Sequence, residues 1–130
     1  MSLSDRIIEL ATRIGEEIKG MVRPDHPGLA RAWVSFGAAG GAVVLRAAHN
    51  VARVERIETG KYRIHFALPM PDANYCWLAF ARNAGSQRKQ KIAAARATAE
   101  AKTPAFVDLI VTTTNGSLSD SSEINLVVYR

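Results

Sequence analysis

Three histidines are the first residues in this 130-residue chain that could perform chemistry, because imidazole binds metals and transfers protons near neutral pH. They are His26, His49 and His65, and no two have the His-x-His or His-x-x-x-His spacing of a ligand pair. The single cysteine, Cys76, forms neither an intrachain disulfide nor a cysteine zinc cage. We therefore expect no metal site and no cofactor within one chain. One alternative stays open, since a trimer would bring three copies of His49 or His65 to its axis.

Hydrolytic chemistry has little support in the sequence. Serines are numerous, but none lies in a Gly-x-Ser-x-Gly turn that would present a nucleophile. Glycan cleavage would require two carboxylates about 5 to 10 Å apart in a cleft; the candidates Asp72, Asp108 and Glu123 are explained as well by solvated or turn-forming acids. The glycine-rich segment 37–41 lacks the Lys-Ser/Thr of a phosphate loop and predicts a turn. We expect a protein that is not an enzyme.

The positive charge of the chain is concentrated in one segment. The formal net charge is +5, and residues 82–102 contain six bases against one acid, whereas the rest contains eleven of each. The candidates for contact with an anionic partner are Arg82, Arg88, Lys89 and Lys91. Residues 81–105 include no aromatic side chain for base stacking, so a nucleic-acid partner is not expected. A loop that only improves solubility is the plain alternative.

Residues 1–22 predict an amphipathic helix that begins near Asp5, with Ser2 or Ser4 as its N-cap. Gly20 and Pro24 mark its end. The apolar stripe spans fewer than three heptads, so the helix must pack on the following domain or on copies of itself. Its oligomerisation positions are Leu3, Ile7, Leu10, Ile14 and Met21.

Residues 23–31 contain two prolines and a glycine and predict a linker, which leaves 32–130 as one β domain. The chain is 48% apolar and 22% charged, as in ordinary globular proteins. No apolar run approaches the roughly 18 residues that span a bilayer, and the N-terminus lacks the pattern of a secretory signal. We expect neither membrane insertion nor an export route.

Alternating apolar residues from Tyr62 to Leu68 predict a strand with one buried face, paired in a hairpin with Val51 to Ile57 across a turn at Gly60. Segments 75–80, 106–111 and 124–129 are apolar at nearly every position. Such strands need cover on both faces, which favours a subunit interface. We expect Cys76, in the first of them, to be buried.

Segment 87–102 is ambiguous. Its alanines and lysines favour a helix, yet we expect a loop followed by a strand near 92–97. Six aromatics recur in the predicted strands, and their alternation favours core packing over a sugar-stacking platform. They are Trp33, Phe36, Tyr62, Phe66, Tyr75 and Trp77. The predicted fold is mainly β: an antiparallel β-sandwich of seven or eight strands after an N-terminal helix.

The middle third of the chain has recognisable motifs. They are Ala-Trp-Val-Ser-Phe at 32–36, Asn-Val at 50–51, Gly-Lys-Tyr-Arg-Ile-His-Phe at 60–66 and Met-Pro-Asp-Ala-Asn-Tyr at 70–75. In this order they resemble the C-terminal tip domains of tailed-bacteriophage tail fibre and minor tail proteins. One departure is Gly37, where members of that family often have Asn or Asp.

The resemblance implies a non-enzymatic homotrimer in the virion tail of a phage or prophage, assembled in the host cytoplasm. Its partners would be other tail proteins and a bacterial surface receptor such as an anionic glycan, which Arg82, Arg88, Lys89 and Lys91 would contact. The heptad pattern alone suits a dimer equally. Two alternatives are a tail adaptor with one large apolar patch and no conspicuous pocket, and a domain that degrades envelope glycans.

Overall fold

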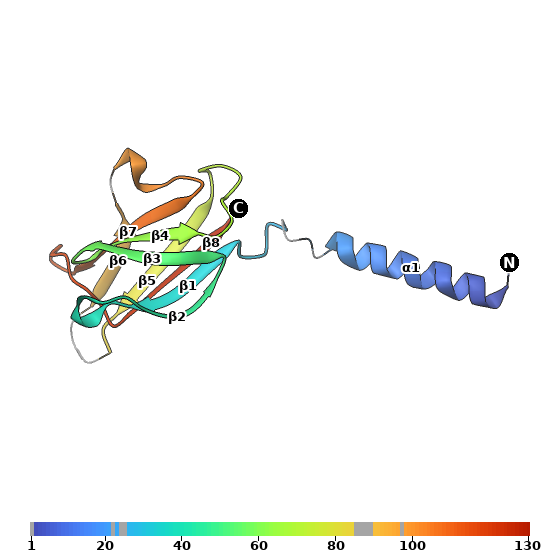
Figure 1. Ribbon diagram of the computed structural model, residues 1–130, viewed down its shortest axis with the longest axis horizontal. Helices are drawn as coiled ribbons and strands as arrows, with labels where there is room; N and C mark the ends of the chain where they lie inside the picture. Colours follow the sequence, from blue (N-terminus) through green and yellow to red (C-terminus); the bar gives the residue numbers. More distant parts are fainter. Residues whose placement is uncertain (1, 22, 24–25, 85–89, 97) are drawn as a thin grey trace.

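The computed structural model describes residues 2–21, 23, 26–84, 90–96 and 98–130, and this part of the chain forms one long helix followed by eight strands (Figure 1). The helix α1 spans Leu3–Met21. The strands are β1 Ala32–Gly37, β2 Val44–His49, β3 Val51–Glu58, β4 Lys61–Phe66, β5 Cys76–Arg82, β6 Lys91–Ala95, β7 Phe106–Thr113 and β8 Glu123–Tyr129. Short 3-10 turns occupy Ala39–Gly41 and Ala99–Ala101.

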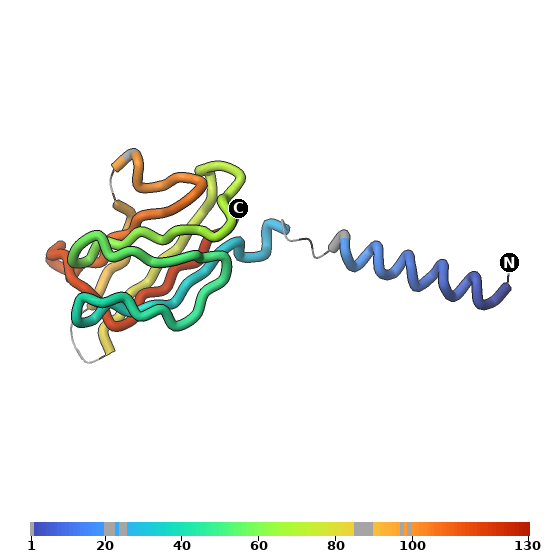
Figure 2. Tube along the Cα trace, in the orientation of Figure 1, coloured from blue at the N-terminus to red at the C-terminus, as the bar shows by residue number. Residues whose placement is uncertain are grey.

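Within the described residues, the strands form two antiparallel sheets that pack face to face. The first sheet has the order β2-β1-β8-β5 and the second has the order β3-β4-β7-β6. Figures 1 and 2 show the C-terminus at the end of the sandwich where the linker enters, and there the Arg31 amide donates to the Val128 carbonyl at 2.8 Å. The prediction of a mainly β sandwich behind an N-terminal helix is thereby confirmed.

The core lies between the two sheets and follows the alternation of the strands. In β4, Tyr62, Ile64 and Phe66 are buried while the residues between them are partly exposed. Phe36 of the first sheet meets Tyr62 of the second edge to face, with ring centroids 5.3 Å apart. Each side chain of this size stabilises the fold by roughly 1.5–3 kcal/mol when it is fully buried. The facing rows of β1, β4, β7 and β8 therefore supply most of the core.

Asn50 forms the corner at which the chain passes from the first sheet to the second. It separates β2 from β3 and has a φ of 53°, a left-handed conformation that Asn tolerates better than most residues. Its side-chain nitrogen donates to the carbonyl oxygens of Arg31 and Leu68, both at 3.1 Å. Its side-chain oxygen accepts from the Leu68 amide at 2.7 Å. The corner is thus held by side-chain bonds to two distant segments.

The predicted hairpin is confirmed, since β3 pairs with β4 in antiparallel register. Gly60 lies in the turn of this hairpin and has a φ of 71°. A Cβ at this position would lie 2.6 Å from the Val111 carbonyl oxygen, so only glycine fits. The predicted strand ends early, at Phe66. Leu68 is 73% exposed instead of buried because its amide bonds to Asn50 and turns the chain out of the sheet.

The three apolar segments form β5, β7 and β8, with bounds that differ from the predicted ones by at most two residues. The described part of 87–102 contains β6 and a 3-10 turn, because pairing with β7 overrides the helix propensity of its alanines. Cys76 is exposed, so the prediction of a buried thiol is wrong. It points outward because the adjacent Trp77 packs against the core.

Helix α1 begins at Leu3, two residues before the predicted start, because Ser2 is its N-cap. The Asp5 amide donates to Ser2 Oγ at 3.2 Å, and the Asp5 carboxylate accepts from the Ser2 hydroxyl at 2.8 Å and the Ser2 amide at 3.2 Å. This reciprocal capping box satisfies free donors of the first turn. The same bonds lower the pKa of Asp5 below its ordinary value.

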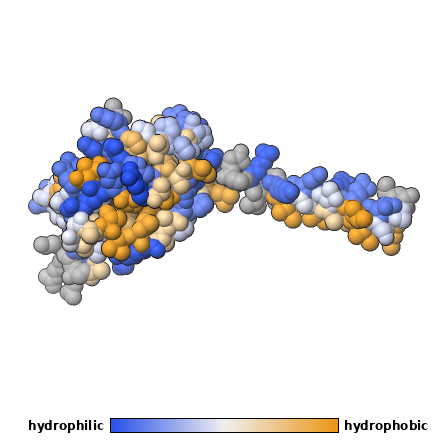
Figure 3. Space-filling model, viewed as in Figure 1, coloured by the Kyte–Doolittle hydropathy of each residue, from blue (hydrophilic) through white to orange (hydrophobic). Residues whose placement is uncertain are grey.

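The apolar stripe of α1 is uncovered. Its leucines and isoleucines at the predicted oligomerisation positions, Leu3, Ile7, Leu10 and Ile14, are between 48% and 74% exposed. Figure 3 shows an apolar band along one side of the helix, which lies apart from the sandwich. The Met21 side chain is outside the described part. We find no helix among the described residues with the length and apolarity to cross a bilayer. Helices in proteins gain most of their stability from packing an apolar face, so this uncovered stripe favours a partner.

We predict that Asn50→Ala lowers the free energy of unfolding by about 2–3 kcal/mol, because it removes three hydrogen bonds and leaves a Cβ at a positive φ. Asn50→Gly removes the same bonds but relieves the strain, so we expect it to be about 1 kcal/mol more stable than Asn50→Ala. Urea unfolding followed by tryptophan fluorescence measures both variants. Parent-like stability of Asn50→Ala would contradict the role assigned to this corner.

Candidate functional site

The predicted receptor-contact residues that the structure describes lie beside the connection between β7 and β8. Arg82, the last residue of β5, is exposed and forms an ion pair with Glu123 at the start of β8. Exposed pairs of this kind contribute roughly 0–1 kcal/mol, so Arg82 can exchange its partner at little expense. Arg88 and Lys89 lie outside the described residues.

Lys91, the first residue of β6, is directed at the same connection. Its ammonium donates to Ser119 Oγ and, at 3.2 Å, to the Asp120 carbonyl oxygen. Lys91 and Arg82 come from different sheets, and both contact residues of the β7–β8 connection or the start of β8. Both described cations already have intramolecular acceptors, and Lys91 is the more firmly held.

Asp120 fixes the β7–β8 connection against the β3–β4 hairpin. Its carboxylate accepts from Arg56 at 2.7 and 3.2 Å, from the Gly60 amide at 3.1 Å and from the Tyr62 hydroxyl. Burial by itself raises the pKa of the Asp120 carboxyl, but the hydrogen bonds from Arg56, Tyr62 and Gly60 outweigh it and hold the pKa below its usual value. Burial is also the main cause that raises the pKa of Tyr62.

The outer face of the first sheet carries an apolar patch, formed by Trp33, Leu78, Phe80 and Val127. Trp33 lies opposite Val127, and Val127 lies opposite Leu78, so the three form one row across β1, β8 and β5. Trp33, Leu78 and Phe80 are 40%, 51% and 72% exposed. They border a shallow depression of about 220 Å³. Contiguous exposed apolar side chains of this kind commonly mark an interaction surface.

The apolar sequence of β5 predicted a need for cover on both faces but did not identify which side chains would be left uncovered. The small residues Ala79 and Ala81 point inward and pack against the core, whereas the large Leu78 and Phe80 point outward. This alternation of large outward and small inward residues is the signal that could have located the patch.

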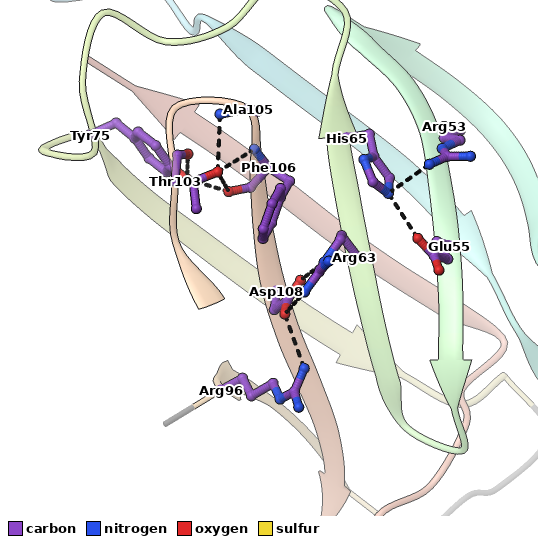
Figure 4. A network of polar contacts seen from close by, with 10 residues as sticks. All are labelled: Arg53, Glu55, Arg63, His65, Tyr75, Arg96, Thr103, Ala105, Phe106 and Asp108. Atoms are coloured by element: carbon purple, nitrogen blue, oxygen red, sulfur yellow. Dashed lines mark hydrogen bonds and ion pairs between the residues drawn. The ribbon is translucent and has the colours of Figure 1, made fainter. Parts of the chain in front are cut away.

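The outer face of the second sheet is charged (Figure 4). Arg63 of β4 donates to Asp108 of β7 through Nε at 2.7 Å and Nη2 at 3.0 Å, and Arg96 donates to the same carboxylate at 3.2 Å. The Arg63 guanidinium also lies 3.9 Å from the centre of the Phe106 ring. Asp108 is almost fully buried, yet both of its oxygens are paired. This network covers β7 with polar groups where the sequence predicted an apolar outer face.

The three histidines are separated from one another. His65 lies on the charged face, with Nε2 2.9 Å from a Glu55 carboxylate oxygen, and this contact lowers the pKa of Glu55. His49 ends β2 and His26 lies in the linker. Among the described residues, no group of three metal-ligating side chains comes together.

The three carboxylates considered for glycan cleavage each pair with an arginine. The pairs are Asp72 with Arg130, Asp108 with Arg63, and Glu123 with Arg82. Hydrogen bonds from Arg130 and from the Asn74 amide lower the pKa of Asp72 to about 2. A carboxylate held ionised in this way does not donate a proton to a leaving group at neutral pH.

Core packing is confirmed for most of the strand aromatics. Phe36, Tyr62, Phe66 and Tyr75 are buried. Trp77 is partly buried and packs against the same core. Trp33 is the remaining one of the six and lies on the outer face. These six residues therefore form no common platform for stacking against a sugar.

We predict that Asp120→Asn reduces the acid sensitivity of the fold. The folded-state pKa of Asp120 lies below its unfolded value, so its stabilisation is complete above about pH 4 and is lost as the pH falls through the folded pKa. The parent should lose more unfolding free energy between pH 5 and pH 2.5 than Asp120→Asn, although the variant should be less stable at pH 7. Urea unfolding at each pH measures this. Glu123→Gln, which removes a partly exposed carboxylate beside the same connection, is the control, and an equal loss in parent and Asp120→Asn would refute the assignment.

Comparison with known proteins finds no family model, no curated protein and no solved structure that matches this chain. The function is therefore inferred from the two sheet faces, from α1 and from the resemblance of residues 32–75.

Proposed function

We propose that this chain is a non-enzymatic tip domain of a phage or prophage tail fibre, which forms a homotrimer and attaches the virion tail to a receptor on the bacterial surface. The observation that carries the proposal is the uncovered apolar surface of the single chain. Both the apolar patch of the first sheet and the stripe of α1 are exposed to solvent. Removing apolar area from water is favourable, so copies of the chain gain by packing these surfaces together.

The resembling motifs occupy positions that hold the fold. Asn50 forms the corner, Gly60 the hairpin turn, and Met70 is buried. Tyr75 is also buried, and its hydroxyl donates to the Thr103 carbonyl at 2.8 Å and the Phe106 carbonyl at 3.0 Å. These roles support a fold shared with tail fibre tips, because each motif residue meets a requirement that few other residues meet.

A trimer agrees with the asymmetry of the sandwich. The apolar patch would face the partner copies, and the charged network around Asp108 would face solvent. Three copies would present the segment between β5 and β6 three times. Individually weak contacts with an anionic glycan would then combine into useful avidity. The proposed contact residues remain Arg82, Arg88, Lys89 and Lys91.

A second candidate, a tail adaptor that binds another virion protein, is favoured by the apolar patch itself. Leu78 and Phe80 could dock on a different tail protein as well as on a second copy of this chain. The depression between them is shallow, as expected for a protein interface. An adaptor would bind virion proteins and would not bind bacterial cells.

We predict that the purified chain sediments as a homotrimer at micromolar concentration. Phe80→Asp should raise the dissociation constant at least tenfold, because a carboxylate in the apolar patch would have to be desolvated on assembly. Analytical ultracentrifugation over a concentration series measures this. Ile57→Asp, at a 40% exposed position of β3 in the second sheet, is the matched control and should leave the trimer intact. A parent chain that sediments as a monomer would contradict the proposal.

We also predict that the labelled chain binds whole cells of a susceptible bacterial strain and that added salt weakens the binding. The double variant Arg88→Gln, Lys89→Gln should lose most of the bound fraction in flow cytometry. Arg6→Gln with Arg13→Gln removes the same charge from exposed positions of α1 and should bind like the parent. Unchanged binding of the first double variant would reject these contact residues, and release of sugars from the envelope would favour an enzyme.

A further inference from the structure

A second cavity, of about 500 Å³, opens at the end of the sandwich where the linker meets the Asn50 corner. This volume lies within the range of pockets that bind small molecules. The polar part of its lining comes from Arg31, His49 and Asn50. The apolar part includes Leu68, Pro69 and Met70.

The backbone of Arg31 is firmly placed. Its amide donates to the Val128 carbonyl at 2.8 Å, and its carbonyl accepts from the Asn50 side chain at 3.1 Å. The side chain of Arg31 therefore starts from a fixed point between β8 and the corner. Asn50 uses its own side chain in the corner, so it shapes the cavity and has less capacity to bind a ligand.

The Arg31 guanidinium lacks an acceptor in the described part of the chain. Its Nε is buried without a hydrogen-bond partner, and the guanidinium forms no ion pair there. Asp72, two residues beyond Met70, is already held by Arg130 at 2.7 and 2.9 Å. A buried donor without an acceptor is costly, and a guanidinium offers five N–H groups in a planar fork. No acceptor for it is found among the described residues, so a ligand that enters the cavity is a candidate for that role.

We propose that this cavity binds a small oxyanion, and specifically the carboxylate of an acidic sugar. A carboxylate matches the guanidinium fork and would accept two parallel hydrogen bonds from Arg31. His49 supplies a further polar group at the rim. Leu68 and Pro69 offer an apolar wall against which the C–H face of a sugar ring packs. Phosphate shares the oxyanion chemistry but would leave that wall unused.

This site is distinct from the segment around Arg82. Ala32, next to Arg31, pairs with Val128, whereas Arg82 pairs with Glu123 at the far end of the same strand. The two positions on β8 are five residue steps apart, or about 17 Å at the rise of an antiparallel strand. The inference goes beyond the proposed function, since it requires neither the trimer nor the contacts of Arg88 and Lys89.

The test uses the full chain labelled with ¹³C at its methionine methyl groups. Met70 lines the cavity, whereas Met1 and Met21 belong to the N-terminal segment and serve as internal references. We expect glucuronate to shift the Met70 methyl resonance saturably, while the neutral parent sugar, glucose, leaves it in place. Arg31→Gln should raise the dissociation constant for glucuronate at least tenfold. Arg53→Gln, which removes an equal charge from the second sheet, should bind like the parent.

Ala67→Phe provides a second variant, because it fills the cavity from an exposed position and leaves Arg31 intact. It should also abolish the shift, and thermal unfolding checks that both variants are folded.

Inorganic phosphate that competes with glucuronate would extend the site to oxyanions in general, and phosphate that does not compete would restrict it to carboxylated sugars; either result supports the site. Equal shifts with glucose and glucuronate, no shift with glucuronate, or parent-like binding by Arg31→Gln would overturn it. If the chain binds glucuronate but does not bind bacterial cells, the result supports this site and contradicts the proposed function.

Discussion

The side chain of Asn50 is the constraint on which the rest of the sandwich depends. It joins the end of the linker, through the Arg31 carbonyl, to the end of β4, through Leu68, at the point where the chain passes between the sheets. These bonds tie the residue before β1 to a residue just after β4, and further along the same two strands Phe36 meets Tyr62 in the core. The same bonds shape the cavity beside Arg31. A single amide side chain thus couples the alignment of two sheets to the form of a pocket.

The sequence predicted those features that depend on neighbours along the chain. Alternation in 62–66 placed Tyr62, Ile64 and Phe66 on one buried face, and Gly60 marked the turn before them. The features it could not predict depend on register, because a shift of one residue moves every side chain of a strand to the opposite face. The exposure of Phe80 and Cys76 belongs to this class. So does the pairing of Arg56 with Asp120, which joins residues 64 positions apart.

The two outer faces of the sandwich differ in chemistry, and this difference restricts how copies can assemble. The charged face cannot be covered cheaply, because the partly exposed guanidinium groups of Arg63 and Arg96 would lose their access to water. The face with Trp33, Leu78 and Phe80 loses little hydration when it is covered and gains from apolar contact. The exposed apolar side chains of the second sheet, such as Ile57 and Ile92, form no described cluster like that of the first sheet, so the first face is the better candidate for contact between copies.

The position of β1 has a mechanical consequence for a domain attached through its N-terminal linker. The linker leads directly into β1, which lies between β2 and β8 within the first sheet. A pull on the linker therefore acts along β1, whereas its hydrogen bonds to both neighbours run across that direction. The load is shared by the whole set of bonds at once and does not open them one after another. Tension applied through the linker would thus be resisted by two ladders acting in parallel, and the sandwich would hold while its more loosely built connections yield.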